Sequence, residues 1–154
     1  MFTITRFEDK YLAELQEMNF MLWLSVQWNS TFLRENAFAA VDENDSLLGV
    51  CALSCDGTWY YLDKERSDIP LYRMQMELCT RDDLKNRNSV ERELINSAKQ
   101  RLLEIKKRYP GKKLCIRFRQ TESRLYQKGG FVLFHLPCPS FRKPYRCISW
   151  RLCR

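Results

Sequence analysis

The sequence lacks several patterns on which whole functional classes depend. It has no apolar run of about 18 residues, the length a transmembrane helix requires, and the apolar stretch Phe20–Leu24 is too late and too short for a signal peptide. It has one histidine, His135, and no C-x-x-C spacing among its seven cysteines, which argues against a metal site. An odd cysteine count favours free thiols in a reducing compartment. We therefore expect a cytoplasmic protein without a metal or a membrane span.

Glycine is scarce, with five in 154 residues, and two of the five are the adjacent pair Gly129-Gly130. None lies between Leu84 and Glu91, a polar stretch that precedes a long helical pattern. There is no linker, internal repeat or low-complexity segment. A chain of this length is expected to form one domain, residues 1–154, with a core large enough to fold without disulfide bridges.

Charge is divided unequally along the chain. Residues 1–100 contain 11 lysines and arginines against 17 aspartates and glutamates, a net charge of −6, whereas residues 101–154 contain 15 against 2, a net charge of +13. The basic part could attract nucleic acid, an acidic membrane or a small polyanion such as a nucleotide cofactor, or it could be a solvated face with no ligand. The sequence shows no helix-turn-helix, zinc-finger or RNA-recognition signature, and this argues against nucleic acid as a partner.

Hydrophobic periodicity predicts two long helices. The first begins after the N-cap candidate Asp9 and runs to about Trp28, because Tyr11, Leu15, Met18 and Leu22 share one helical face. The second begins at Asn88, which with Glu91 three residues later forms a capping-box signature, and it ends at Pro110-Gly111. A short third helix is predicted over about residues 121–128.

Alternation and β-prone composition predict the strands. The polar run 42–45 is predicted to be a hairpin turn between two of them. In Leu71–Cys79 we expect one face to carry Arg73, Gln75 and Glu77. The predicted strands are 2–7, 37–41, 47–53, 59–62, 71–79, 113–118, 131–134 and 145–153. The order of these strands and helices along the chain indicates an α/β (α+β) chain with a mixed sheet.

That order resembles the GNAT acetyltransferase superfamily over nearly the whole chain. The segment Leu125–Phe131, LYQKGGF, looks like the signature near the C-terminus of that family, an aromatic-tyrosine pair followed by Gly-Phe. The strand, loop and helix from Met74 to Leu103 stand where the family binds acetyl-CoA. The resemblance implies a mixed, mostly antiparallel sheet of six to seven strands, flanked by three to four helices.

The resemblance also implies a reaction. Acetyl-CoA would lie in a V-shaped opening between two central parallel strands that end near Cys79 and Phe118, and the acetyl group would pass directly to a primary amine of a small molecule or peptide. Tyr126 would protonate the departing thiolate, although the same tyrosine could be a packing residue. Glu77 is the candidate to accept the proton of the amine, and its alternative is a surface glutamate in a cross-strand charge pair.

Cofactor contacts are expected from the strand end and from the loop and helix start that follow: Leu78, Cys79, Thr80, Lys85, Arg87, Asn88 and Ser89. Here the sequence departs from the family, whose loop reads Gln/Arg-x-x-Gly-x-Gly/Ala so that backbone N–H groups hold the pyrophosphate. Aligning Leu94-Ile95 with the family's apolar pair places Ser89 and Glu91 at the two glycines. Lys85 and Arg87 would have to replace the lost amide contacts.

Glu91 leaves two functions open. A carboxylate at a helix N-terminus satisfies the N–H groups that a pyrophosphate would use, and it repels the ligand by on the order of 1 kcal/mol at a partly exposed site. The first function is an acyl-CoA-dependent N-acetyltransferase, whose acidic N-terminal part suits a cationic acceptor and whose basic C-terminal part suits the cofactor. The alternative is a catalytically silent GNAT-like binding module, with a homodimer through its last strand as an option.

Overall fold

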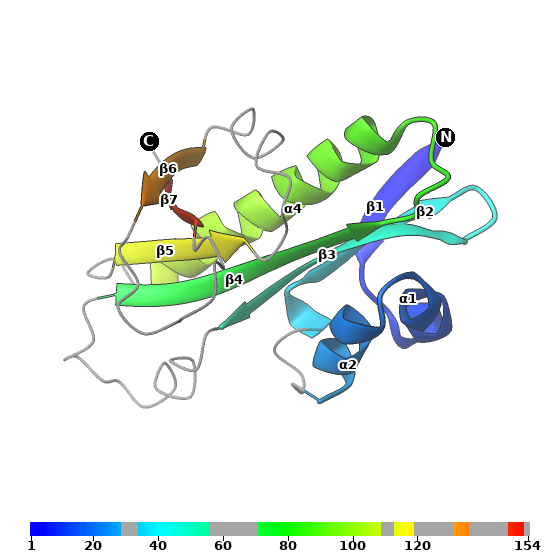
Figure 1. Ribbon diagram of the computed structural model, residues 1–154, viewed down its shortest axis with the longest axis horizontal. Coiled ribbons are helices and arrows are strands. Elements are labelled where there is room, and N and C mark those ends of the chain that lie inside the picture. Colours follow the sequence, from blue (N-terminus) through cyan, green and yellow to red (C-terminus); the bar gives the residue numbers. More distant parts are fainter. Residues whose placement is uncertain (29–33, 56–70, 109–112, 119–130, 136–147, 153–154) are drawn as a thin grey trace.

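The computed structural model describes residues 1–28, 34–55, 71–108, 113–118, 131–135 and 148–152. The elements, coloured along the chain in Figure 1, are β1 (Phe2–Arg6), η1 (Asp9–Tyr11), α1 (Leu12–Met18), α2 (Phe20–Trp28), β2 (Ala37–Asp42), β3 (Leu47–Cys55), β4 (Leu71–Thr80), α4 (Arg87–Arg108), β5 (Lys113–Phe118), β6 (Phe131–His135) and β7 (Ile148–Leu152).

All these strands lie in one sheet in the order β1-β2-β3-β4-β5-β7-β6. Every neighbouring pair is antiparallel except β4 and β5, which run parallel. The mixed, mostly antiparallel sheet is therefore confirmed, and the long helix α4 is the crossover that a parallel pair requires. The numbers of strands and helices in the whole chain stay predictions, because the predicted strand 59–62 and short helix 121–128 lie outside the described residues.

Two apolar layers cover the sheet, one on each face. On one face α4 packs through Val90, Leu94, Ala98, Leu102 and Ile105 against β3, β4 and β5 residues. On the other face the helices α1 and α2 pack against side chains of β2 and β3. Figure 1 shows the two helical layers on opposite sides of the long strands β3 and β4. Residues of β4 therefore alternate between the two layers, and this alternation determines the surroundings of each site residue.

The predicted helix from Asp9 to Trp28 is two helices instead of one. Asn19 breaks it with an extended backbone, φ −157° and ψ 93°. The Asn19 amide donates to the Leu15 carbonyl at 2.8 Å and so ends α1, while its side-chain Oδ1 accepts from the Leu22 amide at 2.9 Å and so begins α2. The break has a physical cause. From the N-cap position, the asparagine side chain can accept a hydrogen bond from an amide in the first turn of a helix, and asparagine therefore favours this position over the helix interior.

The hairpin between β2 and β3 is confirmed. Asp42 Oδ1 accepts from the amides of Asn44 and Ser46 at 2.8 and 2.9 Å, and Asp45 adopts a left-handed backbone with φ 62°. The Asp45 carboxylate accepts from Lys10 Nζ and from the Tyr11 hydroxyl, each at 2.6 Å. The turn is thereby attached to η1, the short helix that precedes α1.

The last strand, β7, has β5 on one side and β6 on the other. It therefore offers no edge for strand pairing with a second copy along its paired residues, and dimerisation stays an untested expectation. Among the described residues, no helix is long and apolar enough to cross a membrane.

Candidate functional site

The candidate site lies at the end of β4, beyond the residue that pairs with Phe118, the last described residue of β5. β5 pairs with β4 from Leu71 to Met76, where Met76 lies opposite Phe118, the last residue of β5. β4 continues for four more residues, Glu77–Thr80, with β3 still paired on its other side as far as Thr80 opposite Gly49. The resemblance places the V-shaped opening at these two strand ends, and it stays a prediction because residues 119–130 lie outside the described part of the chain. Alternate backbone groups of such a strand end point toward the opening and suit an extended amide-containing chain.

Side chains at the end of β4 alternate between the two helical layers. Leu78 belongs to the cluster beneath α4, whereas Cys79 belongs to the cluster beneath α1 and α2. Glu77 lies opposite Ala52 of that second cluster. It therefore faces the α1–α2 side, where it accepts a hydrogen bond from Gln75 Nε2 at 2.8 Å. The predicted shared face of Gln75 and Glu77 is confirmed.

Cys79 is buried and carries a free thiol. Burial raises its thiol pKa, while a hydrogen bond with Asn19 opposes the shift. A thiol with a raised pKa is a poor nucleophile at neutral pH. Cys79 is therefore suited to contribute its backbone and its small side chain to the site, and it is not a candidate nucleophile.

The loop after β4 leads directly into α4, and the capping-box prediction is wrong. The helix begins at Arg87, so Asn88 lies inside its first turn. The Asn86 carbonyl accepts from the amides of Ser89 and Val90 at 2.9 and 3.2 Å. Asn86 is thus the residue that precedes the helix. Sequence reasoning missed it because two asparagines lie two positions apart and only the second has a glutamate three residues later.

Glu91 therefore does something other than cap. Its side chain points back beneath the first turn, and one oxygen, Oε1, accepts from Thr80 Oγ1 at 3.0 Å and from Arg87 Nε at 2.8 Å. Glu91 is 4% exposed. A buried carboxylate is stable only when it is paired and hydrogen-bonded. The i,i+4 spacing of Arg87 and Glu91 was the signal in the sequence that could have revealed this pair.

Charges around the loop divide into two sides. A hollow of about 400 Å³ lies between α1 and the loop, lined by Glu14, Glu17, Met18, Leu47, Thr80, Arg81, Asp82 and Asp83. The Arg81 guanidinium donates to both carboxylate oxygens of Asp83, at 3.2 and 3.1 Å, and this pairing lowers the pKa of the Asp83 carboxyl. Four carboxylates in one lining make this side unfavourable for phosphate groups.

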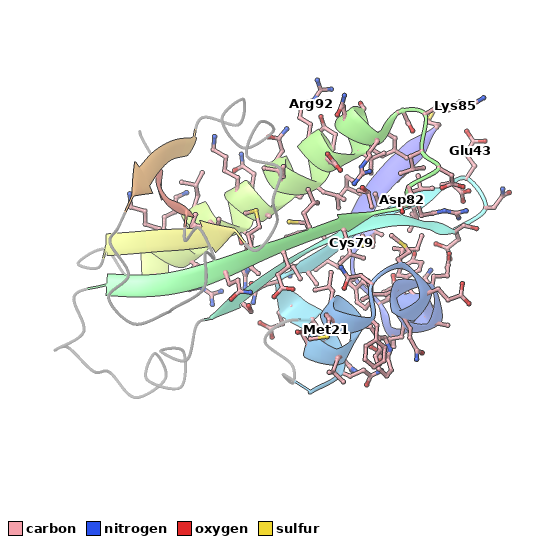
Figure 2. All side chains as sticks on the ribbon, viewed as in Figure 1. Met21, Glu43, Cys79, Asp82, Lys85 and Arg92 are labelled. Carbon is pink, nitrogen blue, oxygen red and sulfur yellow. The ribbon has the colours of Figure 1, made fainter. Side chains whose placement is uncertain are left out.

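Lys85 lies in the same loop, away from that hollow. Figure 2 shows Asp82 nearer to α1 and Lys85 near the start of α4. The side of the loop next to the α4 N-terminus thus presents Lys85 and the half-exposed Arg87, together with the positive end of a helix 22 residues long. This side carries more positive charge than the hollow, although Arg87 is already paired with Glu91 and Asp82.

The structure brings most of the predicted cofactor residues together. Leu78, Cys79 and Thr80 form the strand end, and Arg87, Asn88 and Ser89 form the first turn of α4, joined to the strand through the Thr80–Glu91–Arg87 contacts. Tyr126 lies outside the described residues. No group of three or more His, Cys, Asp or Glu side chains suited to a metal occurs in the described part of the chain.

Sequence comparison finds no relative, since no family model and no curated protein matches the chain. Structural comparison finds solved structures with a similar fold. A GNAT superfamily phosphinothricin acetyltransferase from Sinorhizobium meliloti, in complex with AcCoA, has a TM-score of 0.64 at 10% identity and covers 97% of this chain and 85% of its own. NAA60 from Arabidopsis thaliana, in complex with acetyl-CoA, has a TM-score of 0.59 at 13% identity, with 97% and 96% covered.

The chain has the GNAT fold. A third solved structure, AtaT complexed with acetyl-methionyl-tRNAfMet, has a TM-score of 0.56 at 16% identity, with 97% of this chain and 94% of its own covered. A phosphinothricin acetyltransferase and a protein complexed with acetyl-methionyl-tRNAfMet share one architecture, so the GNAT fold alone does not identify an acceptor. The acceptor has to be inferred from the residues around the opening between β4 and β5.

Proposed function

We propose that the protein is an acyl-CoA-dependent N-acetyltransferase that transfers acetyl directly to a primary amine of a small molecule or peptide. The observation that supports it most is that β4, one of the two parallel strands beside the predicted opening, leads directly into the start of α4 in a chain with the GNAT fold. When bound, acetyl-CoA would supply an activated thioester at this opening. The cytoplasm is the expected compartment.

The residues fit the two halves of the cofactor unequally. The end of β4, Leu78–Thr80, would hold the pantetheine arm along its edge, since that arm is an extended chain with amide groups. The diphosphate would depend on Lys85, Arg87 and the first turn at Asn88 and Ser89. That turn has no glycine and contains the Glu91 carboxylate beneath it. The cations and the helix end fit an anion, whereas the side chains that replace glycine keep phosphates farther from the backbone.

Glu77 is proposed to accept the proton of the acceptor amine, directly or through water. It lies on the α1–α2 face, and the hydrogen bond from Gln75 holds its carboxylate in one orientation. Tyr126 is proposed to donate a proton to the departing thiolate, as a phenol is able to do. A cationic acceptor is favoured over an anionic one because carboxylates dominate the hollow on that same face.

Titration calorimetry with acetyl-CoA, followed by turnover of a panel of primary amines, tests the proposal. We expect micromolar binding by the wild type, Glu77→Gln and Tyr126→Phe, and a loss of about 10²–10⁴-fold in kcat for the two variants. Glu43→Gln, an exposed change in the β2–β3 turn, is the matched control and should leave turnover unchanged. Absence of acetyl-CoA binding at millimolar concentration would refute the proposal.

A catalytically silent GNAT-like module is the second candidate, and Glu91 is the observation that favours it. Its carboxylate already neutralises Arg87, which the cofactor phosphates would otherwise use. The calorimetric titration separates the two candidates, since a silent module of this kind leaves acetyl-CoA unbound.

A further inference from the structure

Glu91 is the one charged side chain that the described residues bury. Its two partners come from different elements. Thr80 is the last residue of β4, and Arg87 is the first residue of α4. Both donate to the same oxygen, Oε1. The carboxylate therefore joins the strand end to the helix start at the point where, according to the proposed function, the pantetheine arm of the donor gives way to its diphosphate.

Arg87 reaches from this buried carboxylate to the surface. Its side chain is 37% exposed, and Nη1 lies 3.5 Å from Asp82 Oδ1. The guanidinium thus stands between two carboxylates, one buried and one fully exposed. A guanidinium so placed has much of its charge compensated before any ligand arrives. A phosphate that binds Arg87 has to displace or share these carboxylates.

The first turn of α4 does little to replace the weakened attraction between Arg87 and a phosphate group. The amides of Ser89 and Val90 bond the Asn86 carbonyl, and the segment that would form a glycine cradle carries side chains at every position. Of the strand residues that would hold the pantetheine arm, Thr80 is the one bonded to Glu91, whereas Leu78 and Cys79 lie outside these contacts. Recognition of the pantetheine arm and recognition of the phosphates are consequently separable in this chain.

We infer that Glu91 is a specificity-determining residue that suppresses phosphate recognition, so that the site selects its acyl donor through the pantetheine arm. The inference rests on the proposed function, because it concerns the donor of that same site. An acyl-pantetheine thioester without a diphosphate should then bind nearly as well as acetyl-CoA. Replacing the Glu91 carboxylate by a neutral group should restore a preference for the phosphate-bearing donor.

Calorimetric titration of S-acetylpantetheine and of acetyl-CoA into the same protein tests the inference, because the ratio of the two Kd values isolates the phosphates. In the wild type we expect the Kd of S-acetylpantetheine, divided by the Kd of acetyl-CoA, to lie within about threefold of one. Glu91→Gln keeps an oxygen that accepts from Thr80 and Arg87 but removes the charge, and we expect it to increase the ratio about tenfold, corresponding to about 1.4 kcal/mol. Glu93→Gln makes the same charge change two residues away at a half-exposed position bonded to Arg92, and it should leave the ratio unchanged.

The salt dependence of the two Kd values tests the inference on the wild-type protein alone. If the phosphates contribute little in the wild type, the Kd of acetyl-CoA should change with KCl almost as weakly as that of S-acetylpantetheine. The inference is overturned if wild-type acetyl-CoA binding is tenfold or more tighter than that of S-acetylpantetheine, or if Glu91→Gln folds and leaves the ratio at its wild-type value. Either result leaves the proposed function standing. If neither thioester binds to any variant, the proposed function itself fails.

Discussion

Replacing Gly49 by alanine tests whether the close approach of β3 to the end of β4 is as tight as the structure indicates. A Cβ at this position would lie 2.7 Å from Thr80 Cγ2, 2.8 Å from the Cys79 carbonyl oxygen and 3.2 Å from Leu94 Cδ1. Overpacking of a core costs about 1–3 kcal/mol, and the reduced freedom of the unfolded chain offsets about 0.4–1 kcal/mol of this. We expect Gly49→Ala to lower the free energy of unfolding by about 1–2 kcal/mol.

Urea unfolding at constant m-value measures the change. Thr80→Ser provides the matched partner, because it removes Cγ2 but keeps the hydroxyl that donates to Glu91. In the double variant the loss should be smaller than the sum of the single losses by about 0.5–1 kcal/mol, while the contact with the Cys79 carbonyl remains. A Gly49→Ala protein as stable as the wild type would refute the reasoning, since it would mean that the two strands separate there without cost.

Three further results are expected. Leu94→Ala should lower the free energy of unfolding by about 2–5 kcal/mol in urea, because this side chain is fully buried in the α4 layer; a loss below 1 kcal/mol would contradict that placement. Asp45→Asn should make the protein lose less stability in acid. Hydrogen bonds from Lys10 and Tyr11 lower the pKa of the Asp45 carboxyl below 3.8. The contribution of the Asp45 carboxylate to stability is therefore complete above pH 3.8 and disappears as the pH falls through its folded-state pKa. Urea unfolding followed from about pH 2 to pH 6 checks this, and equal acid sensitivity of both proteins would count against it. Iodoacetamide at pH 8 should label Cys51 and Cys79 far more slowly in the native protein than in urea, because burial raises both thiol pKa values; mass spectrometry of the two peptides measures the rates, and fast native labelling would show that the sites are open.

The strands were largely predictable from the sequence because their patterns are local. The alternation in Leu71–Cys79 follows from two differently lined faces, and the structure extends this strand by only one residue, Thr80. The break at Asn19 was not found because the apolar positions before and after it stay on one face, so the periodicity hides a one-residue interruption. Asparagine at that point, a strong N-cap residue, was the available signal.

The candidate site was predictable in outline but not in its charges. The order of elements indicated which strand end and which helix start meet, and β4 ends one residue later and α4 begins one residue earlier than predicted. Glu91 was expected to bond the helix amides, yet it bonds Thr80 and Arg87 instead. The capping pattern competes here with Arg87, one turn earlier in the helix, and with the hydroxyl of Thr80 at the end of β4. The contact with Thr80 depends on how α4 packs across the sheet, which a local sequence pattern does not reveal.

The interruption at Asn19 means that, among the described residues, very short helices cover one face of the sheet. α1 has seven residues and α2 has nine, and isolated helices shorter than about 12–15 residues are marginal in water. Their order depends on anchors such as Leu15, Leu22 and Val26 in the apolar layer below them. Amide hydrogens of α1 and α2 should accordingly exchange through local openings that leave the sheet and α4 intact. We therefore expect the side of β4 that carries Glu77 to open independently of the opposite face, which would let a bulky acceptor enter from there.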